Sequence, residues 1–339
     1  MDVPCVKVRP SDGERARSLL ADADRIDDAY EITVRDGWLY IPVQDGNPPA
    51  NLEDALQDGY ELVKASPPAR DTQTTPSDLL GFDPAYERVG ETALLEEDDP
   101  ERARQIADAI VASDLPLETV LNKASKIKGE TRVRDWEVLT GEDTTVVHRE
   151  YGCTFRFDLA EVYFSPRLAT ERHRIVEQVA PDEHVIDLFA GVGPFVIPMA
   201  KRGASCVAID INPTAIDALR ENAALNGVSE HITAIADDVR AVAPSYEDQA
   251  DRLIMNLPHS ANEFLEAAVT MAGSDCILHY YDIQHEDDPF GPGERAIRAA
   301  AEPAYQVTVE HTRVVRSYAP HEVNVCLDVR LERSSPDPG

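Results

Sequence analysis

The hydrophobic pattern changes character at about residue 156. Beyond this point, short apolar runs alternate with stretches that have the three-to-four-residue spacing of amphipathic helices, for example 212–227. This alternation is typical of a parallel sheet with crossover helices and predicts an α/β fold. Two long apolar segments then follow without a helix between them, which predicts an antiparallel pair at the sheet edge. The predicted strands are 184–188, 205–209, 232–235, 252–255, 276–281, 305–315 and 322–331.

The first 155 residues mix the two periodicities in smaller units. Strand patterns at 4–8, 30–34 and 38–43 and a helical pattern at 13–23 predict a small α+β domain over 1–65. Residues 66–79 are rich in Pro, Ser, Thr and Asp and are interpreted as a linker.

A second α+β unit is expected over 80–155. It contains a helical pattern at 101–113 and a hairpin expected through Gly141-Glu142-Asp143. The α/β domain then spans 156–333, and residues 334–339 are expected to form a disordered tail.

Composition narrows the class of protein. No stretch approaches 18 apolar residues and the first residues lack a signal-peptide core, so neither a membrane span nor secretion is expected. The five cysteines are scattered without CxxC spacing, and the histidines form no ligand pair. This argues against a disulfide framework or a metal site and indicates a reducing cytoplasm.

The charge balance is unusual. The net charge is −31, and only six of the 32 basic residues are lysines. Such a surface resembles adaptation to molar salt and predicts a halophilic archaeal origin, since charge repulsion is screened within about 3 Å at 1 M salt. An acidic chain would ordinarily argue against nucleic-acid binding. Because long-range steering is also screened, the local distribution of charge is the better guide.

A cofactor site is expected where the first strand of the α/β domain ends. Residues 185–195, VIDLFAGVGPF, combine a buried strand with a turn that contains Phe189, Gly191 and Gly193. The dinucleotide fingerprint requires a third glycine, but position 196 is valine, which disfavours NAD.

Two acidic residues follow at the ends of the next strands. Asp210 lies seventeen residues after Gly193, where a carboxylate can accept bonds from ribose hydroxyls, and Asp238 follows the third strand, where it can meet an adenine amino group. A helix cap or turn is the alternative role for Asp210. Together with the glycine turn and the terminal strand pair, these positions predict S-adenosylmethionine as cofactor.

The fourth strand ends in Asn256-Leu257-Pro258. Methyltransferases that act on amino groups carry a related Asn-Pro-Pro turn here, where Asn256 supplies a carboxamide, the backbone before proline supplies a carbonyl, and Pro258 stiffens the turn. An ordinary strand-to-helix cap by Asn256 is the alternative.

Five segments carry a resemblance to a known family: 158–175, 185–201, 208–226, 252–268 and 314–331. Together they closely resemble the archaeal and eukaryotic tRNA (guanine-37-N1)-methyltransferases. The resemblance implies a class I, Rossmann-like methyltransferase domain preceded by a tRNA-recognition domain and a middle RNA-binding domain. It also implies methyl transfer from S-adenosylmethionine to N1 of the guanosine that follows a tRNA anticodon.

The same resemblance assigns catalytic roles. Guanine N1 is protonated at neutral pH, so a base must remove its proton while a donor stabilises the charge that builds on O6. Glu171 matches the family's general base; pairing with nearby arginines on a helix surface is the alternative. Arg132 matches an arginine that supports the flipped base, with Arg134 as the competing position. Tyr163 is expected to stack on the base or cofactor, or to pack in the core.

The RNA is expected to contact residues 123–134. This segment holds half of the six lysines and two arginines against one glutamate, so we interpret Lys123, Lys126, Lys128 and Arg134 as phosphate contacts. A solvated basic loop is the alternative. The target base must leave the stacked anticodon loop to reach such a pocket. The expected partner is therefore a tRNA with guanosine at position 37, bound by a monomer.

Three other functions stay open on the sequence. One is an aminocarboxypropyltransferase acting at the same tRNA position, which the Asn256-Leu257-Pro258 turn disfavours. The second is methylation of a tricyclic base at that position. The third is a non-catalytic RNA-binding relative, which the glycine turn, Asp210 and Glu171 disfavour.

Overall fold

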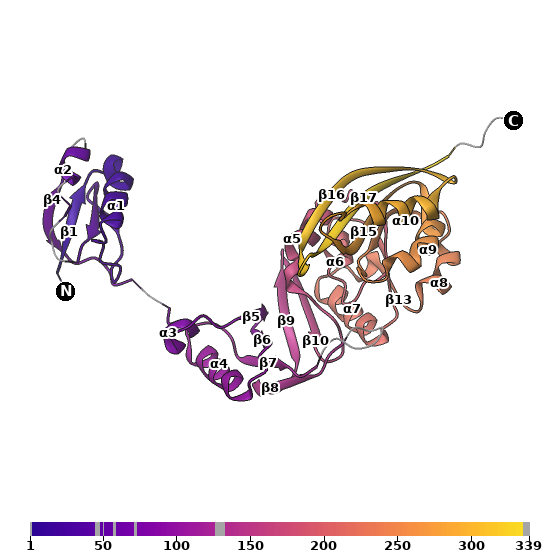
Figure 1. Ribbon diagram of the computed structural model, residues 1–339, viewed down its shortest axis with the longest axis horizontal. Coiled ribbons are helices and arrows are strands. Elements are labelled where there is room, and N and C mark those ends of the chain that lie inside the picture. Colours follow the sequence, from indigo (N-terminus) through magenta and orange to yellow (C-terminus); the bar gives the residue numbers. More distant parts are fainter. Residues whose placement is uncertain are drawn as a thin grey trace. The chain divides into compact units, whose positions relative to one another are not determined.

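The computed structural model describes residues 2–44, 48–49, 51–56, 59–70, 73–125 and 133–334 (Figure 1). The chain divides into two compact units, Met1–Thr74 and Thr75–Gly339. Each has its own buried apolar core. Within the described part of the chain, no helix is both long and apolar enough to cross a membrane.

The N-terminal unit is a four-stranded sheet in the order β2-β3-β1-β4, with helix α1 packed on it. Leu20 of α1 and Val6, Val8 and Ile41 of the sheet are fully buried and form its core. The predicted helix and the strands predicted at 4–8 and 38–43 are confirmed, the strand predicted at 30–34 begins later, at Thr33, and β4 is an addition. The elements are β1 Val3–Val8, η1 Pro10–Asp12, α1 Gly13–Asp22, β2 Thr33–Arg35, β3 Trp38–Pro42, α2 Leu52–Ala55 and β4 Glu61–Ala65.

The last part of the segment interpreted as a linker, 66–79, belongs to a short helix, α3 (Pro76–Leu80). The side chains and backbones of Thr75 and Asp78 form a reciprocal capping box, and Gly81 ends the helix with φ 74°. These caps supply the hydrogen bonds that a helix of this length cannot make internally. Composition alone did not reveal them.

The middle part of the chain forms a second four-stranded sheet, ordered β5-β6-β7-β8. Helix α4 (Pro100–Ala112) confirms the predicted helix and buries Ile106 and Ile110 against this sheet. Asp99 caps its first turn. The strands are β5 Tyr86–Val89, β6 Thr92–Leu95, β7 Thr119–Lys123 and β8 Trp136–Thr140.

The hairpin expected through Gly141-Glu142-Asp143 is wrong. Strand β8 pairs with β7, whereas the next strand, β9 (Thr145–Glu150), pairs with β10 (Cys153–Asp158) through a turn at Tyr151-Gly152. Gly141 has φ 104°, and a Cβ there would lie 2.6 Å from the Thr119 hydroxyl oxygen. The glycine therefore turns the chain from one sheet to the next rather than closing a hairpin.

The largest sheet has seven strands in the order β13-β12-β11-β14-β15-β17-β16. Strands β11 to β15 are parallel, and β17 and β16 are antiparallel, as the sequence predicted. The class I methyltransferase fold is thereby confirmed. The strands are β11 His184–Asp187, β12 Ser205–Asp210, β13 Ile232–Ala236, β14 Ala250–Met255, β15 Ala272–His285, β16 Tyr305–Ala319 and β17 Glu322–Arg333.

Helices cover both faces of this sheet (Figure 1). One face packs against α5 (Ala169–Val176), α6 (Val196–Lys201) and α7 (Pro213–Leu225), and the other against α8 (Val239–Val242), α9 (Leu265–Met271) and α10 (Gly291–Ala301). Because both faces are buried, the middle residues of the central strands, such as Val185-Ile186 and Leu253-Ile254, are apolar. Short 3₁₀ turns complete the connections: η2 Pro166–Leu168, η3 Ser229–His231, η4 Ala243–Tyr246 and η5 Ala261–Phe264.

The β9–β10 hairpin packs on this core rather than on the middle sheet alone. The Asn222 side chain, fully buried in α7, accepts the Arg156 backbone N–H at 2.7 Å and donates to the Val192 carbonyl. The boundary expected between 155 and 156 falls inside β10. The other domain limits stay predictions.

Asn222→Ala should lower the free energy of unfolding by about 1–3 kcal/mol, because a buried N–H and a buried carbonyl lose their partners. Arg220→Ala on the exposed side of the same helix serves as control and should change it by less than about 0.5 kcal/mol. Chemical denaturation of both variants measures the difference. Equal stability of the two would contradict the bridging role of Asn222.

Candidate functional site

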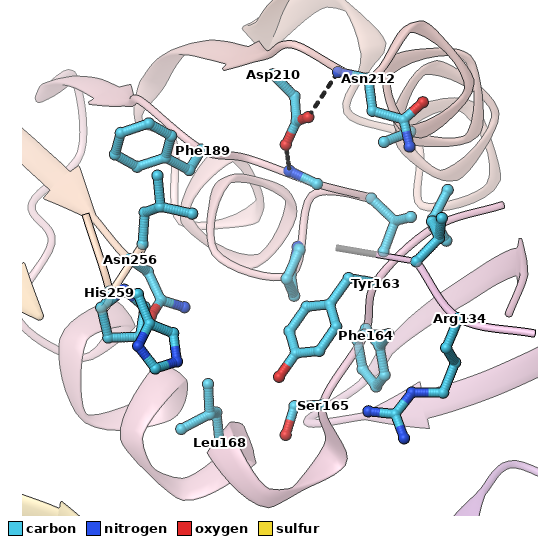
Figure 2. A pocket seen from close by; sticks show the side chains of 18 of the residues that line it. Arg134, Tyr163, Phe164, Ser165, Leu168, Phe189, Asp210, Asn212, Asn256 and His259 are labelled. Atoms are coloured by element: carbon cyan, nitrogen blue, oxygen red, sulfur yellow. Dashed lines mark hydrogen bonds between the residues drawn. The ribbon is translucent and has the colours of Figure 1, made fainter. Parts of the chain in front are cut away.

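A pocket of about 1460 Å³ lies at the carboxyl ends of β11, β12, β13 and β14 (Figure 2). Ligands of doubly wound sheets bind at this edge. The volume exceeds the roughly 300–1,000 Å³ typical of a pocket for one small molecule. It therefore has room for a cofactor and part of a second substrate.

The glycine turn forms one side of the pocket. Gly191 and Gly193 have φ of 52° and 88°, a region that favours glycine. A Cβ on Gly191 would meet no atom within 4 Å, so its backbone borders open space. A Cβ on Gly193 would lie 2.9 Å from Ile197 and 3.1 Å from Leu219, so this glycine is required for packing as well.

Asp210 holds this turn in place. Its carboxylate accepts the Gly191 N–H at 2.7 Å and the Asn212 N–H at 2.9 Å (Figure 2). Burial raises the pKa of Asp210, and the two backbone bonds oppose that rise. An ionised carboxylate has about four acceptor positions, so Asp210 retains capacity for hydroxyl donors. Ribose recognition by Asp210 remains a prediction.

Asp187, the last residue of β11, supports the aromatic side of the pocket. Its side chain is completely buried and accepts the Phe189 N–H at 3.1 Å, while Oδ2 has no partner among the residues described. Burial, with the nearby Asp210 charge, raises the pKa of Asp187 to about 7. Phe189 lines the pocket and packs edge-on against Phe264, with ring centres 5.1 Å apart.

Asp238 caps helix α8 and also lines the pocket. It accepts the Arg240 N–H at 2.8 Å and forms an ion pair with the Arg240 guanidinium, which holds the pKa of Asp238 below its ordinary value. The neighbouring Asp237 lines the same region. Adenine recognition by Asp238 stays a prediction.

The Asn256-Leu257-Pro258 turn borders the pocket beside Phe189 and His259 (Figure 2). The Leu257 carbonyl accepts the N–H groups of Ser260 and Ala261, and the Pro258 carbonyl accepts the Ile283 N–H at 3.1 Å. Because the following helix begins later, at Ala261, Asn256 does not act as its cap. The Asn256 carboxamide is left available to a ligand.

The opposite wall comes from the chain after β10 and from the middle sheet. Tyr163 and Ser165 line it, and Arg134 lies beyond them with its guanidinium 5.5 Å from the Trp136 ring centre (Figure 2). The Trp136 indole donates to the Leu159 carbonyl at 2.9 Å, which joins the middle sheet to this wall. Tyr163 thus faces the pocket, where a planar base could stack on it.

Glu171 lies outside the pocket lining. It is 3% exposed on α5, where its carboxylate accepts bonds from Arg174 at 2.7 and 3.0 Å and from the Tyr281 hydroxyl at 3.1 Å. Arg313 of β16 forms a further ion pair at 3.2 Å. The structure therefore does not bring Glu171 together with Asn256 and Tyr163. Its role as general base stays a prediction.

The ion pairs around Glu171 continue as a buried polar chain across the sheet. Arg174 bonds Asp328, Asp328 bonds His279, and His279 faces Arg252. Although burial opposes it, the bonds from His279 and Arg174 hold the pKa of Asp328 well below its ordinary value. His279, Cys326 and Asp328 are close enough to hold a metal ion, but the two arginines already occupy this group and would repel a cation.

The predicted basic contacts divide into two groups. Lys123 lines the pocket, but its ammonium is paired with Glu96 at 2.5 Å and with Glu87 at 3.8 Å, as expected for a basic group that balances nearby acids. Arg134 is at the pocket as described. Arg132, Lys126 and Lys128 lie outside the described residues.

Several residues at the site were not singled out from the sequence. Asn212 fixes the wall by donating to the Glu161 carbonyl, and His259 bonds the Tyr318 hydroxyl at 2.9 Å. Arg316 and Asn324 enter the pocket from the terminal strand pair. His259 in NLPH and Asn212 in DINP were visible signals, whereas nothing local marked the residues on β16 and β17.

These residues suit S-adenosylmethionine. The open backbone at Gly191 admits a ligand, Asp210 offers acceptors for ribose, and Phe189 presents an apolar ring near the acidic pair that follows β13. The sulfonium is a cation, which the acidic side of the pocket would favour.

Asp210→Ala should weaken S-adenosylmethionine binding by at least about tenfold, because both the ribose acceptor and the support of the Gly191 turn are lost. Calorimetric titration measures the affinity, with Asp217→Ala, an exposed residue of α7, as control. Unchanged affinity combined with slower chemistry would remove Asp210 from the ribose site.

Three family models match the chain along its length. The TRM5/TYW2 methyltransferase domain matches 146–310, the tRNA methyltransferase 5 N-terminal domain matches 5–51, and the TYW2 N-terminal domain matches 73–144.

Individual relatives agree with these matches. A tRNA (guanine(37)-N(1))-methyltransferase Trm5b of Pyrococcus abyssi is 38% identical, over 96% of this chain and 98% of its own. A tRNA(Phe) (4-demethylwyosine(37)-C(7)) aminocarboxypropyltransferase of Pyrococcus horikoshii is 36% identical, over 76% of this chain and 94% of its own. A solved complex of an archaeal Trm5 with a leucine tRNA superposes with a TM-score of 0.72 at 31% identity, covering 97% of this chain and 99% of that one. The chain belongs to the TRM5/TYW2 family of methyltransferases.

Proposed function

We propose that this enzyme transfers a methyl group from S-adenosylmethionine to N1 of guanosine 37 in tRNA. The observation that carries the proposal is that Gly191 and Asp210, Tyr163, and the Asn256-Leu257-Pro258 turn all line the same pocket. S-adenosylmethionine is the cofactor of the family. The full-length relative named for this reaction supports the same substrate.

The chain's own residues have three tasks in this reaction. When bound, the cofactor supplies an electrophilic methyl group on a sulfonium. The Asn256 carboxamide holds the base edge, and Tyr163 stacks on the extruded base. A basic group takes the N1 proton, which frees the lone pair that would accept the methyl group.

We propose Glu171 as that base, and its position defines what it must do. Tyr281, which donates to Glu171, lies two residues before Ile283, whose partner on β17 is the pocket residue Asn324. Glu171 thus contacts β15 two residues before the position at which that strand reaches the pocket wall. Arg174 and Arg313 both pair with its carboxylate. To accept the N1 proton, Glu171 must therefore release its ion pair with Arg313, which is half-exposed, and contact the incoming base instead.

The aminocarboxypropyl reaction is less well supported. The relative with that activity aligns with only 76% of this chain, whereas residues 5–51 match the N-terminal domain of the methyltransferases. The Asn256-Leu257-Pro258 turn also favours methyl transfer. Methylation of a tricyclic base at position 37 is a second activity to be tested with the same tRNA.

The cellular setting is also a proposal. The free cysteines, all buried, fit a reducing cytoplasm, and the net charge of −31 fits a halophilic archaeon. The residues on the cofactor side and on the base side of the pocket belong to the same chain, which fits a monomeric enzyme.

Incubation with an unmodified tRNA transcript bearing guanosine 37 tests the activity. We expect 1-methylguanosine at position 37, one equivalent per tRNA, with more product in 2 M KCl than in 0.1 M because salt screens the acidic chain and its approach to RNA. Nucleoside mapping by mass spectrometry identifies both position and group. An aminocarboxypropyl product, or methylation at another position, would overturn the proposal.

Glu171→Gln tests the base. We expect the single-turnover rate to fall by about 10²–10⁴-fold while S-adenosylmethionine affinity stays within about twofold. Glu177→Gln, at the exposed residue that directly follows α5, is the control. A purely structural Glu171 would instead show a lower melting temperature with a near-normal rate in the surviving folded enzyme.

A further inference from the structure

Two polar residues of the terminal strand pair stand in the pocket wall. Arg316 of β16 and Asn324 of β17 are register partners, and both line the pocket. Asn324 is also opposite Ile283, whose N–H bonds the Pro258 carbonyl. The pair is therefore adjacent to the Asn256-Leu257-Pro258 turn.

Each of these residues has a buried polar atom without a partner. Asn324 is 2% exposed, and its Oδ1 accepts no hydrogen bond from any residue in the described ranges. The same holds for the Arg316 Nε–H as a donor. Such atoms are uncommon because leaving one unsatisfied costs about 1–3 kcal/mol. A donor and an acceptor on paired strands are thus both left open, and they complement each other.

The position of the pair separates it from the cofactor half. Gly191, Asp210 and Asp238 follow β11, β12 and β13, whereas β16 and β17 lie beyond β14 and β15 in the sheet. The Asn256-Leu257-Pro258 turn at the end of β14 stands between the two groups. A ligand that contacts Arg316 is therefore the target base rather than the nucleoside of the cofactor.

Guanine offers an arginine two adjacent acceptors, O6 and N7, on the edge that leaves N1 free. Negative charge builds on O6 as N1 loses its proton, so a guanidinium there stabilises the reacting base more than the resting one. Adenine presents an amino donor in place of O6 and cannot accept from arginine at that position.

We infer that Arg316 binds the O6 edge of guanosine 37 during methyl transfer and that Asn324 is a positioning residue, accepting the Arg316 Nε–H once the base is in place. The inference rests on the proposed function. It adds a cation on the terminal strand pair to the base site and gives each of the two unpartnered atoms a role.

Single-turnover methylation at saturating S-adenosylmethionine and tRNA tests the inference. Arg316→Gln should lower the rate constant by about 10²-fold, as loss of one such donor does elsewhere. Its rate should also reach a plateau at higher pH than that of the wild type, because N1 is harder to deprotonate without the cation. Arg316→Lys should recover part of the rate.

A double-mutant cycle separates the two roles. Asn324→Ala should lower the rate constant by about tenfold alone but add little to Arg316→Gln, because it acts through the arginine. Additive losses would overturn the positioning role. Melting temperatures and S-adenosylmethionine affinities of all variants should stay near wild type. Arg330→Gln is the control, because Arg330 lies on β17 like Asn324 but in a surface ion-pair cluster. It should change neither the melting temperature nor the S-adenosylmethionine affinity.

Other outcomes would overturn the inference. If Arg316→Gln weakens tRNA binding, lowers its salt dependence by about one unit of slope and spares the rate constant, Arg316 contacts a phosphate instead. If it weakens S-adenosylmethionine binding, the pair serves the cofactor. A wild-type enzyme that methylates no guanosine 37 would overturn both the proposed function and this inference, whereas an active wild type with an unaffected Arg316→Gln variant would overturn this inference alone.

Discussion

The acceptance of the Gly191 N–H by the Asp210 carboxylate is the contact on which the site depends. It ties the turn after β11 to the end of β12, two neighbouring parallel strands, and it fixes the backbone that borders the cofactor space. Asp187 adds a second carboxylate close behind, buried and raised in pKa, which aims Phe189 at the same space. Placing two acids so near each other is unfavourable for folding. A cationic ligand in the pocket offsets part of that repulsion.

Around the Gly191–Asp210 contact, the cofactor side and the base side of the pocket are formed by different kinds of structure. The cofactor side consists of strand ends and backbone groups, whose positions follow from the regular parallel sheet. The base side is assembled from side chains of the middle sheet, the segment after β10 and the terminal strand pair, joined by bonds such as that of Trp136 to Leu159. One half therefore depends on local sequence and the other on tertiary packing.

This difference explains which residues of the site could be predicted from the sequence. Gly191, Gly193 and Asp210 were found because each follows an apolar run whose end must reach the sheet edge. Arg316 and Asn324 were not, because they sit inside strands and their register is set by β15. The prediction of a hairpin at Gly141 was wrong for a similar reason. A turn signal indicates that the chain changes direction but not which strand the next segment pairs with. Strands β8 and β9 belong to different sheets. Likewise, the charge of Lys123 was visible, but its pairing with Glu96 was not.

Strand β17 has a consequence for the order in which the molecule is completed. It is the last strand along the chain, yet it lies between β15 and β16, which both precede it. Those two strands do not pair with each other and must wait for residues up to Arg333. During synthesis, the glycine turn can fold against its helices while this part of the sheet is still open. The turn that borders the pocket is thus complete before the wall that carries Arg316 and Asn324.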